Sequence, residues 1–144
     1  MTRLILSLLP KPRRPIAYIY PDVSIKKCVQ IMMEQDIGAL VVANDENILG
    51  ILSERDIVRR AVGMAKDPEH LTAGDALCSN ITILNAEDAV EMAMQAMLEK
   101  KRRHILVREA GDVIAILSIG DILFSLLEDN QRIIEHLENY IHTY

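Results

Sequence analysis

The stretch Gly50-Ile51-Leu52-Ser53-Glu54-Arg55-Asp56-Ile57 has a counterpart later in the chain, Ala115-Ile116-Leu117-Ser118-Ile119-Gly120-Asp121-Ile122. In each stretch, a short apolar run typical of a strand end is followed by Ser-x-x-Asp, a pattern that begins helices. The two stretches lie 65 residues apart, and the same offset aligns residues 16–62 with 81–127 without a gap. Ten aligned positions are identical, and further positions exchange one aliphatic residue for another. The chain therefore contains two copies of one structural unit.

Length and composition limit what the two copies can form. A single copy of about 47 residues buries too little apolar surface to be stable alone, so we expect the copies to pack together within the 144-residue chain. Two packed copies of one fold create paired clefts, and clefts hold ligands. Half of the residues are apolar, only 3% are aromatic and Trp is absent, which predicts an aliphatic, Met-filled core without base-stacking platforms. The net charge of -5 argues against a general nucleic-acid binder.

The spacing of apolar residues predicts an α+β fold. In copy one, residues 16–20, 38–42 and 48–52 have the composition of short strands, and residues 24–35 have the spacing of an amphipathic helix. A last helix is predicted near residues 53–62, so each copy forms a βαββα repeat, and a pseudo-twofold axis relates the two repeats. The predicted domains are an N-terminal lead-in segment (1–15), repeat 1 (16–62), a linker with a second lead-in helix (63–80), repeat 2 (81–128) and a C-terminal helical tail (129–144).

The last predicted helix of copy two continues into the tail. Seven of its residues are spaced alternately four and three apart, which is the pattern of a heptad seam that needs a partner. Two partners fit this pattern: the domain to which the helix belongs, or a second chain in a homodimer. The seam consists of Leu123, Leu127, Asn130, Ile134, Leu137, Ile141 and Tyr144.

No segment predicts secretion or insertion into a membrane. The apolar run 4–9 is too short for a signal peptide and is interrupted by Ser7, and no stretch reaches transmembrane length. Cys28 and Cys78 stand singly in apolar surroundings without metal-ligand spacing, which is typical of reduced, buried thiols. These features predict a cytoplasmic protein with no membrane partner.

Basic residues gather at three places in the sequence. Solvated surface charge is one explanation for such clusters, and an anion site is the other where a cluster borders a cleft. The clusters are Lys11, Arg13 and Arg14 before copy one, Arg55, Arg59 and Arg60 at its end, and Lys100, Lys101, Arg102 and Arg103 in copy two.

The Ser-x-x-Asp pattern has two interpretations. It can form a capping box, in which the Ser side chain accepts a hydrogen bond from the third amide of the helix and the acid accepts one from the amide of the Ser. A helix start with free amides is also a site for phosphate, and a short carboxylate there can accept hydrogen bonds from the hydroxyls of a ribose. The same pattern in register in both copies favours the second interpretation.

The side chains that usually perform catalysis do not form a recognisable motif. His70, His104, His136 and His142 are not spaced as helical metal ligands, so no metal site is predicted. No Ser has a His and an acid at motif spacing, and the chain lacks a phosphate-binding Gly-x-x-x-x-Gly-Lys loop. We therefore predict that the protein is not an enzyme, and keep nucleotide hydrolysis as a distant alternative.

With these residues in place, the chain resembles the tandem CBS-domain family, whose pairs are known as Bateman modules. The resemblance covers residues 16–128 and is closest to bacterial stand-alone pairs with Ser-Glu-Arg-Asp-Ile-Val-Arg in copy one and Ser-Ile-Gly-Asp in copy two. It implies a CBS-pair fold, a flat homodimer, and an adenine ligand such as AMP, ADP, ATP, NAD, NADH or S-adenosylmethionine between the copies. Copy two departs from the family pattern at Leu106 and Ala115, where Pro and Gly are frequent.

The resemblance also implies roles for individual residues. Asp56 and Asp121 would bind ribose hydroxyls, with Ser53 and Ser118 touching ribose or phosphate. Arginines would neutralise the phosphate, and strand backbone would frame the base. The implied ligand-binding residues are Ile16, Ala17, Tyr18, Gly38, Ala39, Leu40, Ser53, Arg55, Asp56, Arg103, His104, Ile105, Ser118, Gly120 and Asp121.

Two functions follow from different classes of protein. The leading hypothesis is an adenine-nucleotide-binding regulatory module that senses energy or redox state and acts in trans on an unknown partner protein. The alternative is a structural or protein-interaction module with no ligand, which assembles through its C-terminal helix.

Overall fold

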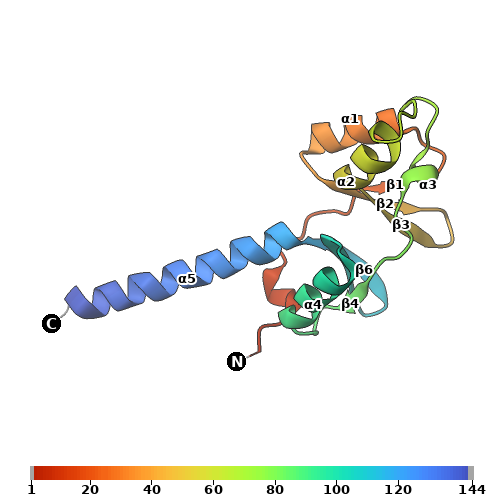
Figure 1. Ribbon diagram of the computed structural model, residues 1–144. Coiled ribbons are helices and arrows are strands. Elements are labelled where there is room, and N and C mark those ends of the chain that lie inside the picture. Colours follow the sequence, from red (N-terminus) through yellow and green to blue (C-terminus); the bar gives the residue numbers. More distant parts are fainter. Residues whose placement is uncertain (1, 143–144) are drawn as a thin grey trace. The chain divides into compact units, whose positions relative to one another are not determined.

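The computed structural model describes residues 2–142, and these fall into two compact units (Figure 1). Unit 2 is the continuous segment Pro15–Ile81. Unit 1 combines the described residues up to Arg14 with those from Thr82 onward. Each unit has its own apolar core.

Unit 2 contains copy one of the repeat. Its three strands form a sheet of order β1-β2-β3, in which β1 is parallel to β2 and β2 is antiparallel to β3. The elements are β1 (Tyr18–Ile19), α1 (Ile25–Gln35), β2 (Ala39–Ala43), β3 (Ile48–Ser53), α2 (Glu54–Ile57), the π-helical segment η2 (Val58–Val62) and α3 (Ala73–Ala76).

The bounds of α1 follow from local chemistry. Ser24 caps its first turn by accepting a hydrogen bond from the Lys27 amide at 3.2 Å, which satisfies an amide that the helix leaves without a partner. Ile25, Cys28 and Met32 then face the core at helical spacing. The helix ends at Asp36, whose φ of 52° is left-handed.

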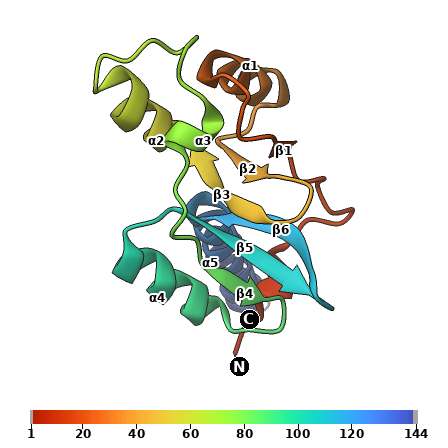
Figure 2. The same cartoon turned by 90° about the vertical axis from the view of Figure 1, so that its right-hand side faces the viewer.

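Unit 1 repeats this arrangement 65 residues later. Its sheet has the order β4-β5-β6, with one parallel and one antiparallel pairing (Figure 2). Helix α4 begins and ends 65 residues after α1, and its cap Lys101 has the same φ of 52° as Asp36. The elements are η1 (Ile5–Leu8), β4 (Ile83–Asn85), α4 (Val90–Lys100), β5 (His104–Glu109), β6 (Asp112–Ser118) and α5 (Ile119–His142).

The lead-in segment of each copy belongs to the core of the other copy's unit. Ile5 is fully buried in unit 1, and its amide donates to the Asp88 carbonyl at 2.9 Å. In unit 2, Ala73 and Ala76 of α3 are fully buried, and the Ala73 amide donates to the Val23 carbonyl at 2.8 Å. Both predicted lead-in helices are present as η1 and α3, and the structure adds that they are exchanged.

The predicted α+β fold with two βαββα repeats and a helical extension is confirmed. The predicted Met-filled core is wrong for most methionines: Met32 and Met97 are buried, whereas Met33, Met64, Met92 and Met94 are exposed. Aliphatic residues fill both cores instead. The seam residue Tyr144 lies outside the described residues. Every helix in the described part of the chain is too short or too polar to cross a lipid bilayer.

Candidate functional site

The helix start in copy one is a capping box. Ser53 ends β3, and its Oγ accepts from the Asp56 amide at 3.2 Å. The Oδ2 atom of Asp56 accepts from the Ser53 amide at 3.0 Å and from the Ser53 hydroxyl at 2.8 Å. Asp56 is only 6% exposed. The capping interpretation is therefore confirmed here, and the carboxylate that would bind ribose is largely enclosed by protein.

The helix start in copy two has the same cap but a different exposure. The Ser118 amide donates to Asp121 Oδ2 at 2.9 Å, and the Asp121 amide donates to Ser118 Oγ at 3.1 Å. Asp121 is exposed, unlike Asp56. A carboxylate has about four lone-pair sites, so Asp121 retains capacity for hydroxyl donors from solvent or a ligand.

A third capping box was not predicted from the sequence. Thr72 and Asp75 at the start of α3 make the same reciprocal bonds, with Thr72 donating to Asp75 Oδ2 from its amide at 3.0 Å and from its hydroxyl at 2.9 Å. These bonds, the one from the amide first, lower the pKa of Asp75 below its usual value. The pattern Thr72-Ala73-Gly74-Asp75 was visible in the sequence. Its presence outside the repeat means that cap geometry alone does not identify a ligand site.

Strand residues adjoin each helix start. In copy one, Ala39 pairs with Ser53, and the Glu54 amide donates to the Gly38 carbonyl at 3.0 Å. The Ala17 carbonyl accepts from the Val41 amide at 2.9 Å, which places the lead into β1 on the same sheet. The Leu40 side chain is fully buried in the core, so only its backbone remains for a ligand. The structure thus brings together residues 17, 38, 39, 53 and 56 within unit 2.

Copy two repeats these neighbours. His104 pairs with Ser118, and the Ile119 amide donates to the Arg103 carbonyl at 2.8 Å. Ile105 is 1% exposed and belongs to the core. Gly120 has no steric need to be glycine, because an added Cβ would be 3.5 Å from its nearest neighbour, Ser118 Oγ.

The remaining predicted residues of copy one lie at different depths. Ile16 and Arg55 are half-buried, and Tyr18 is exposed. Tyr18 lines a hollow of about 320 Å³ together with Tyr20, whose hydroxyl donates to Asp45 at 2.7 Å. This hydrogen bond and the Asp45 charge raise the pKa of Tyr20.

A larger hollow lies beside Asp121 within unit 1. Its volume is about 500 Å³, and its lining combines three carboxylates with three guanidinium groups. Within the described part of the chain, Arg14 and Arg132 make no ion pair or side-chain hydrogen bond, whereas Arg3 pairs with Asp129. The charged lining residues are Arg3, Arg14, Asp121, Glu128, Asp129 and Arg132. Arg14 belongs to a basic cluster visible in the sequence, but no sequence pattern identified Arg132 as a candidate binding residue.

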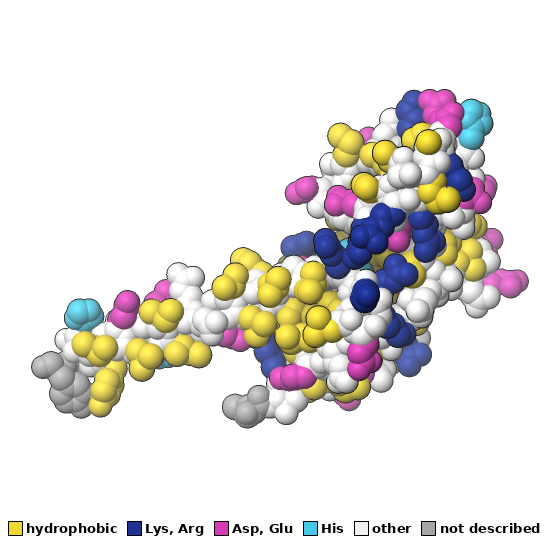
Figure 3. Space-filling model, in the orientation of Figure 1, with side chains coloured by type: hydrophobic (Ala, Val, Ile, Leu, Met, Phe, Trp, Pro, Cys, Tyr) yellow, Lys and Arg dark blue, Asp and Glu magenta, His cyan; other side chains and the backbone are white. Residues whose placement is uncertain are grey.

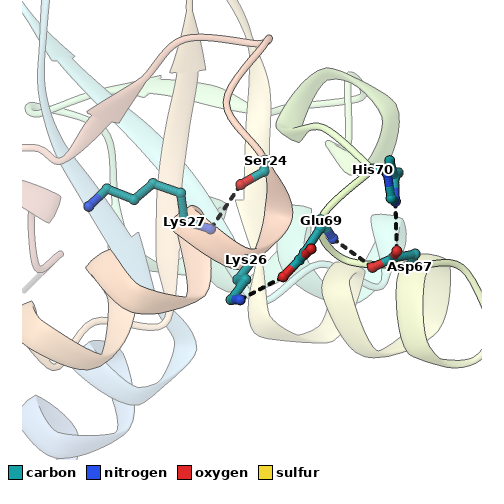
Figure 4. Close-up of polar contacts among 6 residues, drawn as sticks. All are labelled: Ser24, Lys26, Lys27, Asp67, Glu69 and His70. Carbon is teal, nitrogen blue, oxygen red and sulfur yellow. Dashed lines mark hydrogen bonds and ion pairs between the residues drawn. The ribbon is translucent and has the colours of Figure 1, made fainter.

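The histidine of the linker is held in a local network (Figure 4). His70 Nδ1 lies 2.6 Å from Asp67 Oδ2, and Lys26 Nζ lies 2.7 Å from Glu69 Oε1. The Glu69 amide also donates to Asp67, which lowers the pKa of that carboxyl, and Glu69 raises the pKa of Lys26. No group of described side chains is arranged to hold a metal ion.

Comparison with known proteins gives a consistent family. The model of the CBS domain matches residues 7–63 and 73–128. The chain is 32% identical over 100 residues to hypoxic response protein 1 of Mycobacterium tuberculosis, covering 69% of this chain and 70% of that protein. It is 27% identical over 125 residues to the mitochondrial CBS domain-containing protein CBSX3 of Arabidopsis thaliana, covering 83% of this chain and 61% of that protein.

Solved structures agree with this result. The crystal structure of the CBS domain NE2398 superposes with a TM-score of 0.80 at 29% identity, covering 88% of this chain and 99% of that one. The match to CBSX3, by contrast, spans less than two thirds of that protein.

Proposed function

The chain belongs to the CBS-domain family as a tandem pair, and we propose that it is a regulatory module that binds an adenine nucleotide and reports it to a partner protein. The proposed ligands are AMP, ADP, ATP, NAD and NADH. We also propose that the protein is cytoplasmic, that it has no catalytic role and that it acts in trans on a separate protein.

One observation carries this proposal: the exposed Asp121 carboxylate shares a hollow with Arg14 and Arg132. A carboxylate can accept hydrogen bonds from the vicinal hydroxyls of ribose, and guanidinium groups bind phosphate in a bidentate manner. The volume of about 500 Å³ lies within the range of small-ligand pockets. Asp121 is therefore better supported as the residue that binds ribose than Asp56, which is buried.

Ligand binding should stabilise the folded chain by mass action, by about 2.7 kcal/mol at a ligand concentration of 100 times Kd. We propose thermal unfolding with each of the five nucleotides and with S-adenosylmethionine. Asp121→Asn should abolish the shift. The matched control is Asp112→Asn, which changes another exposed aspartate of unit 1 in the β5–β6 hairpin.

Two outcomes would count against nucleotide binding. The first is that none of the six compounds shifts the wild-type transition. The second is that Asp121→Asn and Asp112→Asn respond alike to a compound that does shift it.

Self-association is supported by matching apolar residues on the two units. Met33, Val58 and Val62 are exposed in copy one, and Leu98, Leu123 and Leu127 are exposed at the positions 65 residues later. Exposed apolar residues that recur in register are typical of an interaction surface. We propose that the protein is a homodimer, and light scattering at micromolar concentration tests this by its mass.

A further inference from the structure

The second half of α5 leaves a row of apolar side chains exposed to solvent. All residues from Gln131 to His142 are exposed, and five of them are large and apolar (Figure 3). These are Ile133, Ile134, Leu137, Tyr140 and Ile141. A helix of this length is marginal in water, because most helical stability comes from packing an apolar face. The segment lies beyond residue 128, where the match to the CBS-domain model ends.

The side of α5 that faces its own unit is the other side. Ile122 and Ser125 are its buried residues, and Asp129 pairs with Arg3 of the N-terminal segment. Glu128 and Arg132 line the hollow on this side. The helix therefore docks on its own unit near its start, and its apolar side stays uncovered. For the described residues, this excludes the domain to which the helix belongs as the partner of the heptad seam.

The uncovered side is wider than a simple two-position seam. Leu123, Leu127, Asn130, Ile134, Leu137 and Ile141 occupy the a and d positions of the heptad. The positions that flank them on one side, g, are Leu126, Ile133 and Tyr140. The positions on the other side, e, are Phe124, Gln131 and Glu138. One flank is thus apolar throughout, and the other is mainly polar.

This asymmetry bears on the direction of a partner helix. In a parallel pair the g flank of one helix meets the e flank of the other, so Ile133 would meet the partner's Glu138. In an antiparallel pair the g flank of one helix meets the g flank of the other, and the e flanks likewise meet each other. Ile133 would then meet the partner's Ile133, and Leu126 the partner's Tyr140.

We propose that α5 pairs with α5 of a second copy of this chain, antiparallel and centred near Arg132. The same centre aligns every core layer: Leu127 with the partner's Leu137, Ile134 with the partner's Asn130, and Ile141 with the partner's Leu123. A twofold axis through the centre makes the face self-complementary, as a closed dimer requires. This pairing rests on the homodimer proposed above, whose exposed residues Leu123 and Leu127 it includes, and it does not depend on nucleotide binding.

Charge argues against a membrane as the occupant. Helices that lie on anionic membranes carry Lys and Arg on their polar side. Between Ile119 and His142 the only Lys or Arg is Arg132, whereas the acidic residues are Asp121, Glu128, Asp129, Glu135 and Glu138. Such a helix is repelled by anionic lipid.

Disulfide mapping in the full-length chain tests the pairing. The variant Leu127→Cys/Leu137→Cys should form a covalent dimer on mild oxidation, with position 127 of one copy joined to position 137 of the other. The two positions are about 15 Å apart along one helix, too far for a bond within a chain. Each single variant should remain reduced, because like positions are distant in this arrangement. The native Cys28 and Cys78 are buried.

A second measurement uses a matched pair of substitutions. Leu137→Asp should raise the dissociation constant of the dimer at least about tenfold in sedimentation experiments, whereas His136→Asp, which adds the same charge one residue away, should leave it unchanged. Bonds that join like positions would overturn the antiparallel arrangement. A monomeric wild type, or equal effects of the two substitutions, would show that a second copy of this chain does not cover the apolar side of α5. The apolar side would then be a binding surface for a different protein.

Discussion

Arg3 forms an ion pair with Asp129, 126 residues further along the chain, and so joins the N-terminal segment to α5. Both side chains remain partly exposed, at 30% and 41%. Exposed ion pairs contribute only about 0–1 kcal/mol, because solvent screens them and two long side chains must be ordered. Two residues away, Ile5 is fully buried among Val90, Ile122 and their neighbours. Apolar burial, more than charge, should therefore hold the segment in place.

Ile5→Ala should lower the free energy of unfolding by about 2–5 kcal/mol, as for other buried Ile and Leu side chains. Arg3→Gln should lower it by less than about 1 kcal/mol. Urea unfolding of both variants measures the difference. Equal losses in the two variants would mean that the ion pair has been undervalued.

Gly50→Ala should destabilise the protein by about 1–3 kcal/mol, because Cys78, which forms an isolated β-bridge with Ile51, passes directly over it. An added Cβ would overlap the Cys78 carbonyl oxygen and come within 2.8 Å of Leu77 Cδ1. Gly120→Ala is the matched control, since its Cβ has room and Ala favours a helix by up to about 1 kcal/mol. The midpoint of thermal unfolding should fall for Gly50→Ala and rise for Gly120→Ala. A neutral Gly50→Ala would show that the β-bridge between Ile51 and Cys78 can shift at little cost in free energy.

Burial raises the pKa of the Cys28 thiol to about 11. The folded state therefore disfavours the thiolate, and the thiol ionises first in the unfolded chain, where its pKa is near the ordinary value of 9.0. The associated stability is complete below pH 9 and is lost as the pH rises toward 11. Urea unfolding from pH 8 to pH 10.5 should show a steeper loss for wild type than for Cys28→Ala. Parallel curves would contradict the shift.

The capping bonds from Thr72 lower the pKa of Asp75, so the folded state favours its carboxylate. This stability is present above the unfolded pKa near 3.8 and is lost as the pH falls through the lower folded value. Asp75→Asn should be less stable than wild type at pH 6, and the deficit should shrink below pH 3.8. A deficit that is constant from pH 6 to pH 2.5 would assign the loss to packing.

Elements whose causes lie within a few residues were predictable from the sequence. Helix α1 was predicted over residues 24–35 and spans Ile25–Gln35, because the Ser24 cap and the apolar spacing are local signals. The heptad spacing likewise anticipated α5 as far as the described residues extend. The turn between β5 and β6 also has a local cause, since Gly111 adopts a φ of 86° that suits glycine.

Features that depend on distant contacts were not predictable. The exchange of lead-in segments places Ile5 beside Val90, and no local pattern encodes that choice. The difference in exposure between Asp56 and Asp121 arises in the same way, because identical capping motifs meet different surroundings. For the candidate site, the sequence predicted the helix starts and the basic cluster at Arg14, but not the contribution of Arg132.

The exchange of lead-in segments also sets an order of events during synthesis. Unit 2 is contiguous, so all of it has been made once Ile81 is added. Unit 1 needs residues from both ends of the chain, and Ile5 must wait for Ile122 before its core is complete. At about 5–20 residues per second, the ribosome takes roughly 6–23 s to add the residues between them. Ile5 therefore stays in contact with water until after all of unit 2 has been made.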